Sequence, residues 1–375
     1  MIKDKYAIYV HIPFCKARCS YCAFSSCTDY SLQAKYFTKL YEEIEHFRDM
    51  GSHIFTIYLG GGTPSSVEIK YIDGVFDSLR QNFDLSNVEE ISVECNPESV
   101  TEELLACLKR NGVNRLSMGL QSFNDETLKR IGRIHTYEDF LSALQLTQKC
   151  GFDNVNADLI VGLPESAEEF RHSVDTVAKL PLKHLSVYAL ELHEDTALYK
   201  LCKAKYPFSD DELADMYDYA RVKFGENRYM GYEISNFAKV GYECKHNLNY
   251  WKEGRYFAFG ASASGFVGNV RYVNPHTIAD YLSTPVERMH DDCETISMGE
   301  QANEFVMLGL RLSSGVNLRE FNTRYGSDFF DFFPNSRRLL EQGYLRVENG
   351  CVVVPVDKLY VINSILCELL VFDGE

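Results

Sequence analysis

The sequence predicts an α/β protein built on a partial (β/α)6 barrel, with a mainly helical, winged-helix-like module towards its C-terminal end. Three observations support this fold class. Six short apolar runs recur with room for a helix between them, three glycines stand where helices should end, and an Asn-Gly hairpin signal follows a helix-rich tail. Successive strand-then-helix units imply a parallel sheet, and six units fit an open barrel better than a closed one of eight.

The predicted strands of the barrel are short and rich in β-branched and aromatic residues. They cover residues 6–12, 54–59, 91–95, 115–120, 155–160 and 185–190. The predicted helices between them cover residues 32–50, 69–82, 101–111, 136–150 and 166–180. Three of these helices are followed by a glycine, which tolerates the left-handed backbone that ends a helix: Gly51, Gly112 and Gly151.

The rest of the chain has a different pattern, and we predict three segments: a barrel in residues 1–200, an extension in 201–295 and a module in 296–375. The extension contains a predicted helix over 208–228, an extended segment over 229–237, and a polar-aromatic stretch over 244–251 that holds the only tryptophan. The module is predicted to contain helices 301–312, 318–325, 329–342 and 359–371, and strands 344–348 and 351–355 around the turn Asn349-Gly350.

Composition and charge narrow the function classes. The 375 residues are 45% hydrophobic and 25% charged, a balance typical of a folded globular protein. The formal net charge of −16 disfavours an extended nucleic-acid interface, and residues 300–375 carry 7 Lys and Arg against 11 Asp and Glu. We therefore expect no nucleic-acid partner, even for the winged-helix-like module.

The sequence also bears on location and on redox compartment. No apolar run approaches the roughly 18 residues of a membrane span, and residues 1–5 lead into the first strand without a small-residue cleavage site. We expect a cytoplasmic protein without a membrane span, and leave contact with a membrane surface open. Of the 12 cysteines, only those within residues 15–27 cluster, and scattered cysteines are typical of buried reduced thiols.

Cys15, Cys19 and Cys22 have the spacing Cys-x3-Cys-x2-Cys directly after the first predicted strand. Three thiolates can hold three irons of a [4Fe–4S] cluster and leave the fourth iron without a protein ligand. That iron can chelate the amino and carboxylate groups of S-adenosylmethionine (SAM), and the reduced cluster can pass an electron to the sulfonium. Two alternatives are a zinc site with Cys27 as the fourth ligand, although no second cysteine pair exists, and thiols without a metal.

Further candidate residues follow the predicted strands at the same edge of the sheet, where chemistry gathers in such folds. Residues 60–64 (Gly-Gly-Gly-Thr-Pro) follow the second strand and allow close approach of the backbone to a ligand. Glu94 closes the third strand and Asp158 lies near the end of the fifth, where each can accept from a ribose hydroxyl or an ammonium group. Gln121 and Arg133 can hold a carboxylate. Taken singly, these residues also fit a tight turn, ion pairs and a solvated helix position.

Together these motifs resemble the radical SAM superfamily. The resemblance rests on residues 9–22 (Tyr-Val-His-Ile-Pro-Phe-Cys-x3-Cys-x-Tyr-Cys), 60–64, 119–123 (Gly-Leu-Gln-Ser-Phe) and 158–164 (Asp-Leu-Ile-Val-Gly-Leu-Pro). Within the superfamily, the chain is similar to the branch of oxygen-independent coproporphyrinogen III oxidase (HemN) and the HemW-type heme chaperones. Residues 246–251 match the HNxxYW motif of the HemW type. The oxidase has a fourth cysteine where this chain has Phe24, and an N-terminal extension where this chain has 14 residues before Cys15.

The resemblance implies a barrel of the radical SAM type with a [4Fe–4S] cluster, SAM and heme as cofactors. Residues that match contacts to cluster-bound SAM, the last of them against the adenine, are Tyr9, Gly61, Glu94, Asp158 and Tyr21. Residues that match the site of a second SAM in the oxidase are Gly62, Thr63, Gln121 and Arg133. The resemblance implies His246 as a heme ligand, with Cys244 as the alternative.

The functional hypothesis is a heme chaperone that binds heme and transfers it to an acceptor protein, which the sequence does not name. The alternative is a radical SAM enzyme that acts on a tetrapyrrole, either as a decarboxylase like the oxidase or as a methyl- or alkyl-transferring relative. We do not expect decarboxylase activity, because Phe24 replaces the fourth cysteine and the N-terminal extension is missing. No residue is assigned as catalytic.

Overall fold

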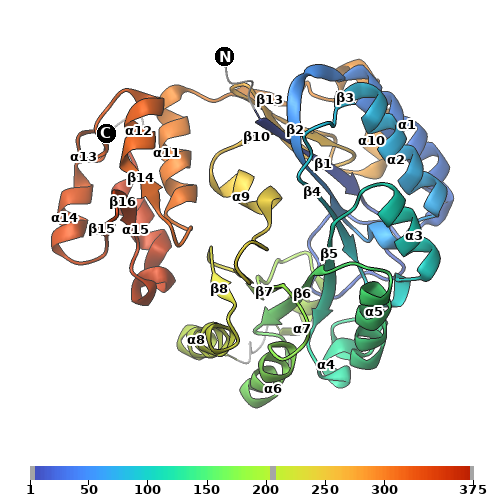
Figure 1. Cartoon of the computed structure of the whole chain (residues 1–375), viewed down its shortest axis with the longest axis horizontal. Coiled ribbons are helices and arrows are strands. Elements are labelled where there is room, and N and C mark those ends of the chain that lie inside the picture. Colours follow the sequence, from blue (N-terminus) through green and yellow to red (C-terminus); the bar gives the residue numbers. More distant parts are fainter. Residues whose placement is uncertain (1–4, 203–207, 372–375) are drawn as a thin grey trace.

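The computed structural model, described for residues 5–202 and 208–371, confirms the predicted α/β fold with a barrel that does not close (Figure 1). Six strands pair in parallel in the order β1, β2, β4, β5, β6 and β7. Their bounds are Lys5–Ile12, Asp49–Gly61, Glu90–Cys95, Arg115–Gln121, Asn154–Val161 and His184–Ala189. All six coincide with predicted strands, and their carboxyl ends therefore meet at one edge.

Helices on the outer face of the sheet connect these strands (Figure 1). They are α1 (Gln33–His46), α2 (Ile69–Asn82), α3 (Glu102–Arg110), α4 (Asp125–Arg130), α5 (Tyr137–Lys149) and α6 (Ala167–Val177). Thr136 and Ser166 begin α5 and α6 with capping boxes, in which the hydroxyl accepts from the third backbone amide of the helix. Gly112 and Gly151 follow α3 and α5 with φ of 83° and 82°, as the sequence predicts.

One helix boundary was predicted wrongly. The predicted helix 32–50 ends at His46, and β2 begins at Asp49, so Gly51 lies in a strand and does not end a helix. The physical reason is a local turn, because the Asp49 carboxylate accepts from the backbone amides of Gly51 and Ser52 at 2.7 and 3.1 Å. This competes with continuation of the helix.

The extension enlarges the sheet at both edges. β10 (Arg255–Phe259) pairs in parallel with β1, and β9 (Asn236–Ala238) pairs antiparallel with β7. The remaining short strands of this sheet are β3 (Phe83–Asp84), β8 (Met230–Gly231), β11 (Ser264–Val267), β12 (Val270–Val273) and β13 (Cys293–Thr295). The helices of this region are α7 (Ala197–Cys202), α8 (Asp210–Glu226), α9 (Lys245–Trp251) and α10 (Ile278–Ser283). The segment predicted as extended over 229–237 is two short paired strands, and the stretch 244–251 is mostly helix α9.

The C-terminal module has its own apolar core and a three-stranded sheet, as the winged-helix prediction requires. Its elements are α11 (Met298–Gly309), β14 (Val316–Asn317), α12 (Leu318–Tyr325), α13 (Phe329–Phe332), α14 (Asn335–Glu341), β15 (Arg346–Glu348), β16 (Cys351–Val353) and α15 (Ile362–Leu369). Asn349 and Gly350 form the hairpin turn with positive φ. The predicted helix 329–342 is two helices, because Pro334 separates them.

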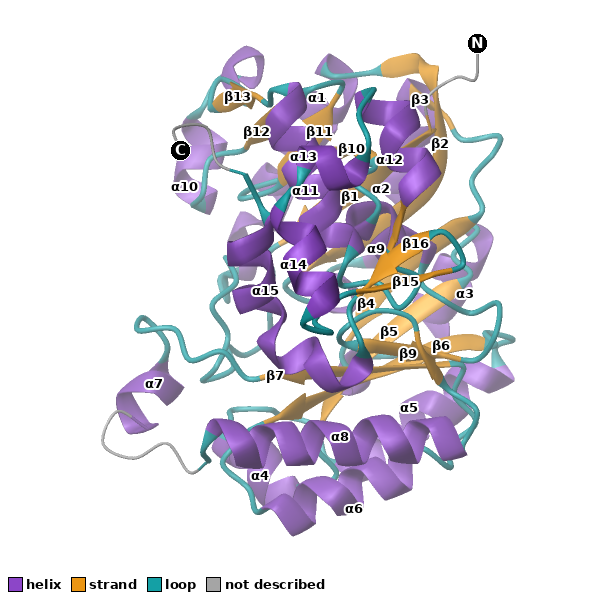
Figure 2. Cartoon of the chain, turned by 90° about the vertical axis from the view of Figure 1, so that its left-hand side faces the viewer, coloured by secondary structure: helices purple, strands orange, loops and turns teal. Residues whose placement is uncertain are grey.

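The module lies opposite the concave side of the sheet, with α9 between them (Figures 1 and 2). The guanidinium of Arg271 donates two hydrogen bonds of 2.7 Å to Glu304 of α11, and Tyr325 of α12 donates to Glu253 at 2.9 Å. Among the described residues, no helix has both the length and the apolar character to cross a membrane. The expectation about a cleavage site concerns residues 1–5, of which residues 1–4 lie outside the described part. The division of the chain into three segments stays a prediction.

Candidate functional site

The inward face of the barrel carries a row of polar side chains that are not fully buried. Along a strand, successive side chains point to opposite faces, so the apolar residues between them pack outwards against the helices. Inward residues that retain solvent access on five of the six strands are Tyr9, Tyr58, Glu94, Asp158 and Tyr188. Partial exposure in the middle of a parallel sheet means that these side chains border an open space.

Glu94 is held by donors from the neighbouring strand. Its carboxylate accepts from the Tyr58 hydroxyl at 2.8 Å and from the backbone amide of Gly61 at 3.1 Å. Burial raises the pKa of Glu94 to about 7, the Tyr58 hydrogen bond opposes that rise, and the negative charge of Asp158 adds to it. Glu94 is therefore a carboxylate whose charge a cationic ligand would stabilise.

Asp158 is the second inward carboxylate. It accepts from the Asn156 side-chain amide at 2.8 Å and from the Ser117 hydroxyl at 3.4 Å. Burial raises the pKa of Asp158, and the positive charge of Arg115 lowers it. Arg115 is 2% exposed and lies on β5, the strand between the two carboxylates. The site thus holds two acceptors over one buried cation.

The glycine-rich segment after β2 approaches the chain just before the cysteines. The amides of Gly62 and Thr63 donate to the carbonyls of Ile12 and Phe14 at 2.9 and 2.8 Å. A Cβ on Gly62 would lie 2.7 Å from the carbonyl carbon of Pro13, so only glycine allows this approach. The Thr63 hydroxyl in turn donates to the Cys15 sulfur at 3.4 Å.

The cysteine loop, residues 13–27, presents four partly exposed thiols, those of Cys15, Cys19, Cys22 and Cys27, from irregular backbone. The pKa of Cys15 is raised by burial and, less strongly, by the charges of Cys22 and Cys19, while the Thr63 hydroxyl lowers it. Burial also raises the pKa of Cys22. In the described part of the chain, no group of three His, Cys, Asp or Glu side chains could hold one metal ion.

Two further predicted residues meet above Gly119. A Cβ built on Gly119 would lie 2.8 Å from the Gln121 amide nitrogen and 2.9 Å from an Arg133 nitrogen. Arg133 donates to Asn96 at 2.8 Å, to the Gly119 carbonyl at 2.7 Å and to the Cys19 sulfur at 3.6 Å. Its positive charge lowers the pKa of Cys15 and Cys22. Arg133 is therefore not a solvated helix residue but part of the cysteine site.

Tyr21 lies beside the cysteine loop and packs on a small apolar cluster of Leu128, Ile131, Ile160 and Leu163. This places an aromatic ring between the loop and the ends of β6 and α4. Gln121 ends β5 with φ of 72° and is 9% exposed, so little of its side chain reaches solvent. The structure thus gathers the predicted residues of the barrel around one edge of the sheet.

His246 is placed differently from the cysteines. It lies on α9, is 1% exposed, and uses both ring nitrogens: Nδ1 with the Thr56 hydroxyl at 3.0 Å and Nε2 with the Tyr250 hydroxyl at 2.8 Å. Burial lowers its pKa to about 3, so the imidazole is neutral. Its ring centroid lies 5.0 Å from that of Tyr58, the residue that donates to Glu94.

Helix α9 begins where Glu90 of β4 accepts from the backbone amides of Lys245 and His246, each at 3.0 Å. The N-terminal residue Cys244 provides no side-chain cap, so a distant carboxylate performs that role. The Cys244 thiol is buried, and burial raises its pKa to about 12. A thiolate at this position is strongly disfavoured, which weakens Cys244 as the alternative heme ligand.

Sequence reasoning did not identify four residues that shape the site: Tyr58, Arg115, Asn156 and His184. Their only signal in the sequence is alternation: Tyr58, Arg115 and Asn156 are polar residues at inward positions of predicted strands, and His184 directly precedes the predicted strand 185–190. His184 is fully buried and bonds to the Asn156 amide oxygen at 2.7 Å. Asn156 then donates to Asp158.

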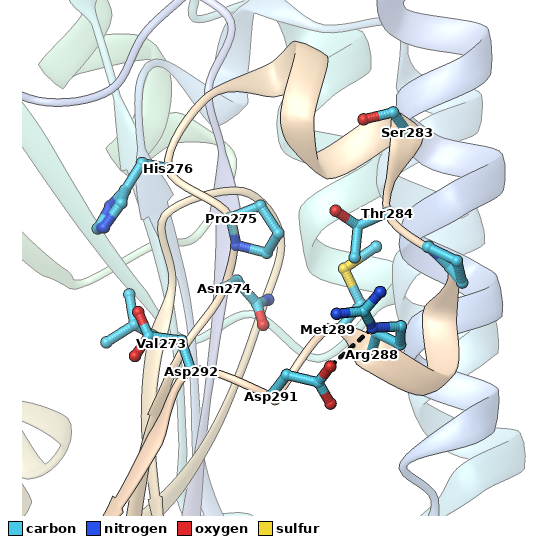
Figure 3. A pocket seen from close by; sticks show the side chains of 11 residues that line it. Val273, Asn274, Pro275, His276, Ser283, Thr284, Arg288, Met289, Asp291 and Asp292 are labelled. Carbon is cyan, nitrogen blue, oxygen red and sulfur yellow. Dashed lines mark hydrogen bonds and ion pairs between the residues drawn. The ribbon is translucent and has the colours of Figure 1, made fainter.

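A surface hollow of about 420 Å³ lies elsewhere, between β12 and the segment around α10 (Figure 3). Arg288 and Asp291, three residues apart on the segment after α10, form an ion pair of 2.8 Å at its edge, and Asn274 also lines it. None of the sequence-predicted site residues lines it. One hydrogen bond joins it to the cysteine loop: the Ser25 hydroxyl donates to the His276 carbonyl at 2.9 Å.

Comparisons with known proteins identify the family and the fold. Residues 9–177 match the family model of the radical SAM superfamily, and residues 296–355 match that of the HemN C-terminal domain. The chain is 35% identical over 358 residues to the heme chaperone HemW of Bacillus subtilis (strain 168), covering 92% of this chain and 93% of that protein. It is 35% identical over 269 residues to heme chaperone HemW of Escherichia coli (strain K12), covering 70% of each chain.

Among solved structures, coproporphyrinogen III oxidase (HemN) from Escherichia coli, described as a radical SAM enzyme, superimposes with a TM-score of 0.82. The match covers 97% of this chain and 89% of that one at 24% sequence identity. At that identity, the likeness supports the fold alone.

Proposed function

The chain belongs to the HemW family of the radical SAM superfamily, and from this premise we propose that it binds heme and transfers it to an acceptor protein. The observation that carries the proposal is the 35% identity to heme chaperone HemW of Bacillus subtilis, which extends over 92% of this chain. The acceptor is a heme-dependent apoprotein, and the cytoplasm is the proposed site of action. Phe24, which is 68% exposed on the cysteine loop, adds no ligand of the kind that the oxidase has there.

The proposal assigns Cys15, Cys19 and Cys22 as ligands to three irons of a [4Fe–4S] cluster, with the fourth iron left for SAM. Soft thiolate donors fit iron, and two neighbouring groups stabilise their charge. Thr63 donates to the Cys15 sulfur at 3.4 Å and Arg133 to the Cys19 sulfur at 3.6 Å. When bound, the cluster supplies the electron that SAM cleavage requires.

The inward residues of the barrel are proposed to hold that SAM. Glu94 and Asp158 accept from its ammonium group or ribose hydroxyls, the Gly61 backbone permits close approach, and the predicted aromatic contacts are Tyr9 and Tyr21. The four residues that match a second SAM site already bond or pack within the protein: Gly62, Thr63, Gln121 and Arg133. The proposal therefore includes one SAM.

His246 is the proposed heme ligand. Its imidazole is neutral, as a ligand to iron must be, because burial lowers its pKa to about 3. His246 is 1% exposed and both of its ring nitrogens are hydrogen-bonded, so ligation requires its surroundings to open and one of the Thr56 and Tyr250 contacts to break. Heme loading is therefore proposed to be coupled to that opening.

The test is an anaerobic titration of cluster-reconstituted protein with heme, with bound heme counted after gel filtration. Wild-type protein is expected to retain heme stoichiometrically, and His246→Ala to retain much less. His172→Ala is the matched control, because that histidine is exposed on α6. Absence of heme retention by the wild type would refute the chaperone proposal, and equal retention by His246→Ala would refute the ligand assignment.

A transfer assay completes the test. Heme-loaded protein mixed with an apoprotein that lacks heme should lose its heme to that protein faster than free heme is released into buffer. The alternative function, a radical SAM enzyme acting on a tetrapyrrole, predicts instead that deoxyadenosine forms in proportion to a changed porphyrin. Heme transfer without deoxyadenosine favours the chaperone.

A further inference from the structure

Each of the two inward carboxylates, Glu94 and Asp158, is linked to a buried histidine through one intermediate residue. We call each of these two chains of contacts an arm. Below Glu94, the Tyr58 hydroxyl donates to the carboxylate at 2.8 Å, and the Tyr58 ring packs against the His246 ring with centroids 5.0 Å apart. Thr56, two residues before Tyr58 on the same strand, bonds to His246 Nδ1 at 3.0 Å. The imidazole thus fixes the height and tilt of the ring whose hydroxyl holds Glu94.

The second arm links His184 to Asp158 through Asn156. His184 Nδ1 donates to the Asn156 amide oxygen at 2.7 Å, and the Asn156 amide nitrogen donates to Asp158 at 2.8 Å. His184 is 0% exposed and Asn156 is 1% exposed. The histidine therefore orients the amide so that its NH2 group faces the carboxylate.

The two arms meet beneath the site. His184 Nε2 accepts from the Tyr232 hydroxyl at 2.8 Å, and that hydroxyl accepts from the backbone amide of Cys244 at 3.3 Å. Cys244 is the residue just before α9, which carries His246. Tyr232 and α9, both from the extension, therefore lie beneath the site and contact both arms. We call them the floor of the site.

Burial and the charge of Arg115 lower the pKa of His184, so its imidazole is neutral. A neutral imidazole has one donor and one acceptor nitrogen, and each ring has two polar neighbours. Arg115, Glu90, Tyr9 and Tyr58 are the other charged or titratable groups that face this region from the strands. No water is needed to complete the hydrogen bonding of either histidine.

We propose that His246 and His184 are positioning residues for Glu94 and Asp158, and that the HNxxYW helix thereby contributes to SAM affinity as the floor of the SAM site. This inference rests on the proposed role of Glu94 and Asp158 as SAM contacts. It is separate from heme ligation by His246, because the Glu94 arm acts through Tyr58 with no heme present.

The experiment measures the dissociation constant of SAM for anaerobically reconstituted protein by equilibrium dialysis. His246→Gln and His184→Gln keep an amide in place of the ring and are each expected to weaken SAM binding by about 5- to 10-fold, the worth of one buried hydrogen bond. Tyr58→Phe is expected to weaken it by a similar factor. Because His246 acts through Tyr58, the double variant should bind SAM no more weakly than Tyr58→Phe alone.

Tyr281→Phe is the matched control. Tyr281 is also fully buried and donates to a buried carboxylate, Glu43, at 2.5 Å, on the far side of β1 from the site. It should lower thermal stability without changing SAM affinity, which separates positioning from general loosening of the fold. Circular dichroism melts of all variants confirm that they are folded.

The outcomes are distinct. Weaker SAM binding by both histidine variants, with a non-additive double variant and an unchanged control, supports the inference. Unchanged SAM affinity in His246→Gln with loss of heme retention overturns it and leaves His246 as a heme ligand alone. Multiplying effects of His246→Gln and Tyr58→Phe also overturn it. If wild-type protein binds no SAM, the proposed SAM site itself fails, whereas the heme titration tests the chaperone function separately.

Discussion

The cysteine loop and helix α9 each carry a sequence motif, but the motif side chains are partly exposed in the loop and buried in α9. In the cysteine loop, the backbone is irregular, the thiols are partly exposed, and few side chains fix them. In α9, His246 is 1% exposed, both ring nitrogens are bonded, and Glu90 caps the helix. The thiols of the loop reach solvent, whereas α9 has already used the polar groups of His246 inside the protein. A motif therefore identifies where chemistry is encoded, and burial decides whether that chemistry needs a conformational change.

The largest expected effect separates the two regions by cluster content. Cys19→Ala should lose the broad absorbance near 400 nm (an approximate wavelength) that reconstituted protein gains from its iron–sulfur cluster. The free energy of unfolding of the cluster-free protein should change little, because the Cys19 side chain is only partly buried. Cys150→Ala, at the end of α5, is the control and should keep the cluster. A full cluster in Cys19→Ala would show that the ligand assignment is wrong.

The next largest effect is on stability, and we expect it in α9 and not in the cysteine loop. His246→Ala should lower the free energy of unfolding of cluster-free protein by about 2–4 kcal/mol, since it leaves a cavity and removes the hydrogen-bond partner of the buried Thr56 hydroxyl and the partly buried Tyr250 hydroxyl. The exposed His172→Ala should cost less than about 0.5 kcal/mol. Urea denaturation followed by circular dichroism measures both. A small loss for His246→Ala would mean that α9 is loosely held and is not a fixed floor.

Much of the barrel could be predicted because its signals are local. The capping residues Thr136 and Ser166 and the strand containing Asp158 needed only their neighbours in sequence. Helix α9 could not be predicted, because Glu90 caps it from 156 residues away and its own sequence offers no cap. Likewise, Tyr58 and His184 act through contacts with distant residues, and no spacing in the chain encodes those. The predicted end of the helix before Gly51 was wrong, because the Asp49 side chain stabilises a local turn there.

A third effect concerns pH and the carboxylate that joins the two regions. The pKa of Glu94 is about 7 in the folded chain against an ordinary value of 4.5, so the folded state binds its proton more tightly. Its contribution to stability is therefore present below about pH 4.5 and is lost as pH rises to about 7. The glutamine in Glu94→Gln does not titrate. Between pH 4.5 and 7, the free energy of unfolding of wild type should therefore decrease by about 1–3 kcal/mol more than that of Glu94→Gln.

Urea midpoints at several pH values measure that difference. Glu165 and Glu233, whose pKa values are also raised to about 7, titrate in both proteins and cancel from the comparison. SAM binding to wild type should strengthen over the same window, since the ionised carboxylate is the form that attracts an ammonium group. Parallel stability curves for the two proteins would mean that Glu94 is already ionised at low pH and that the site is wetter than its burial indicates.

The smallest effect tests the edge of the cysteine loop. Cys27 lies in the loop. Its sulfur accepts from the Asp29 amide at 3.3 Å and contacts the Asp29 carbonyl at 3.9 Å, while its backbone bonds pair it with Cys15 and Pro13. Because its structural role is carried by the backbone, Cys27→Ser should keep the iron content and change the free energy of unfolding by less than about 0.5 kcal/mol. Iron analysis after reconstitution, with Cys19→Ala as the cluster-free reference, measures this. Loss of bound metal in Cys27→Ser would restore a four-cysteine site, and the open iron that SAM binding requires would no longer follow from the loop.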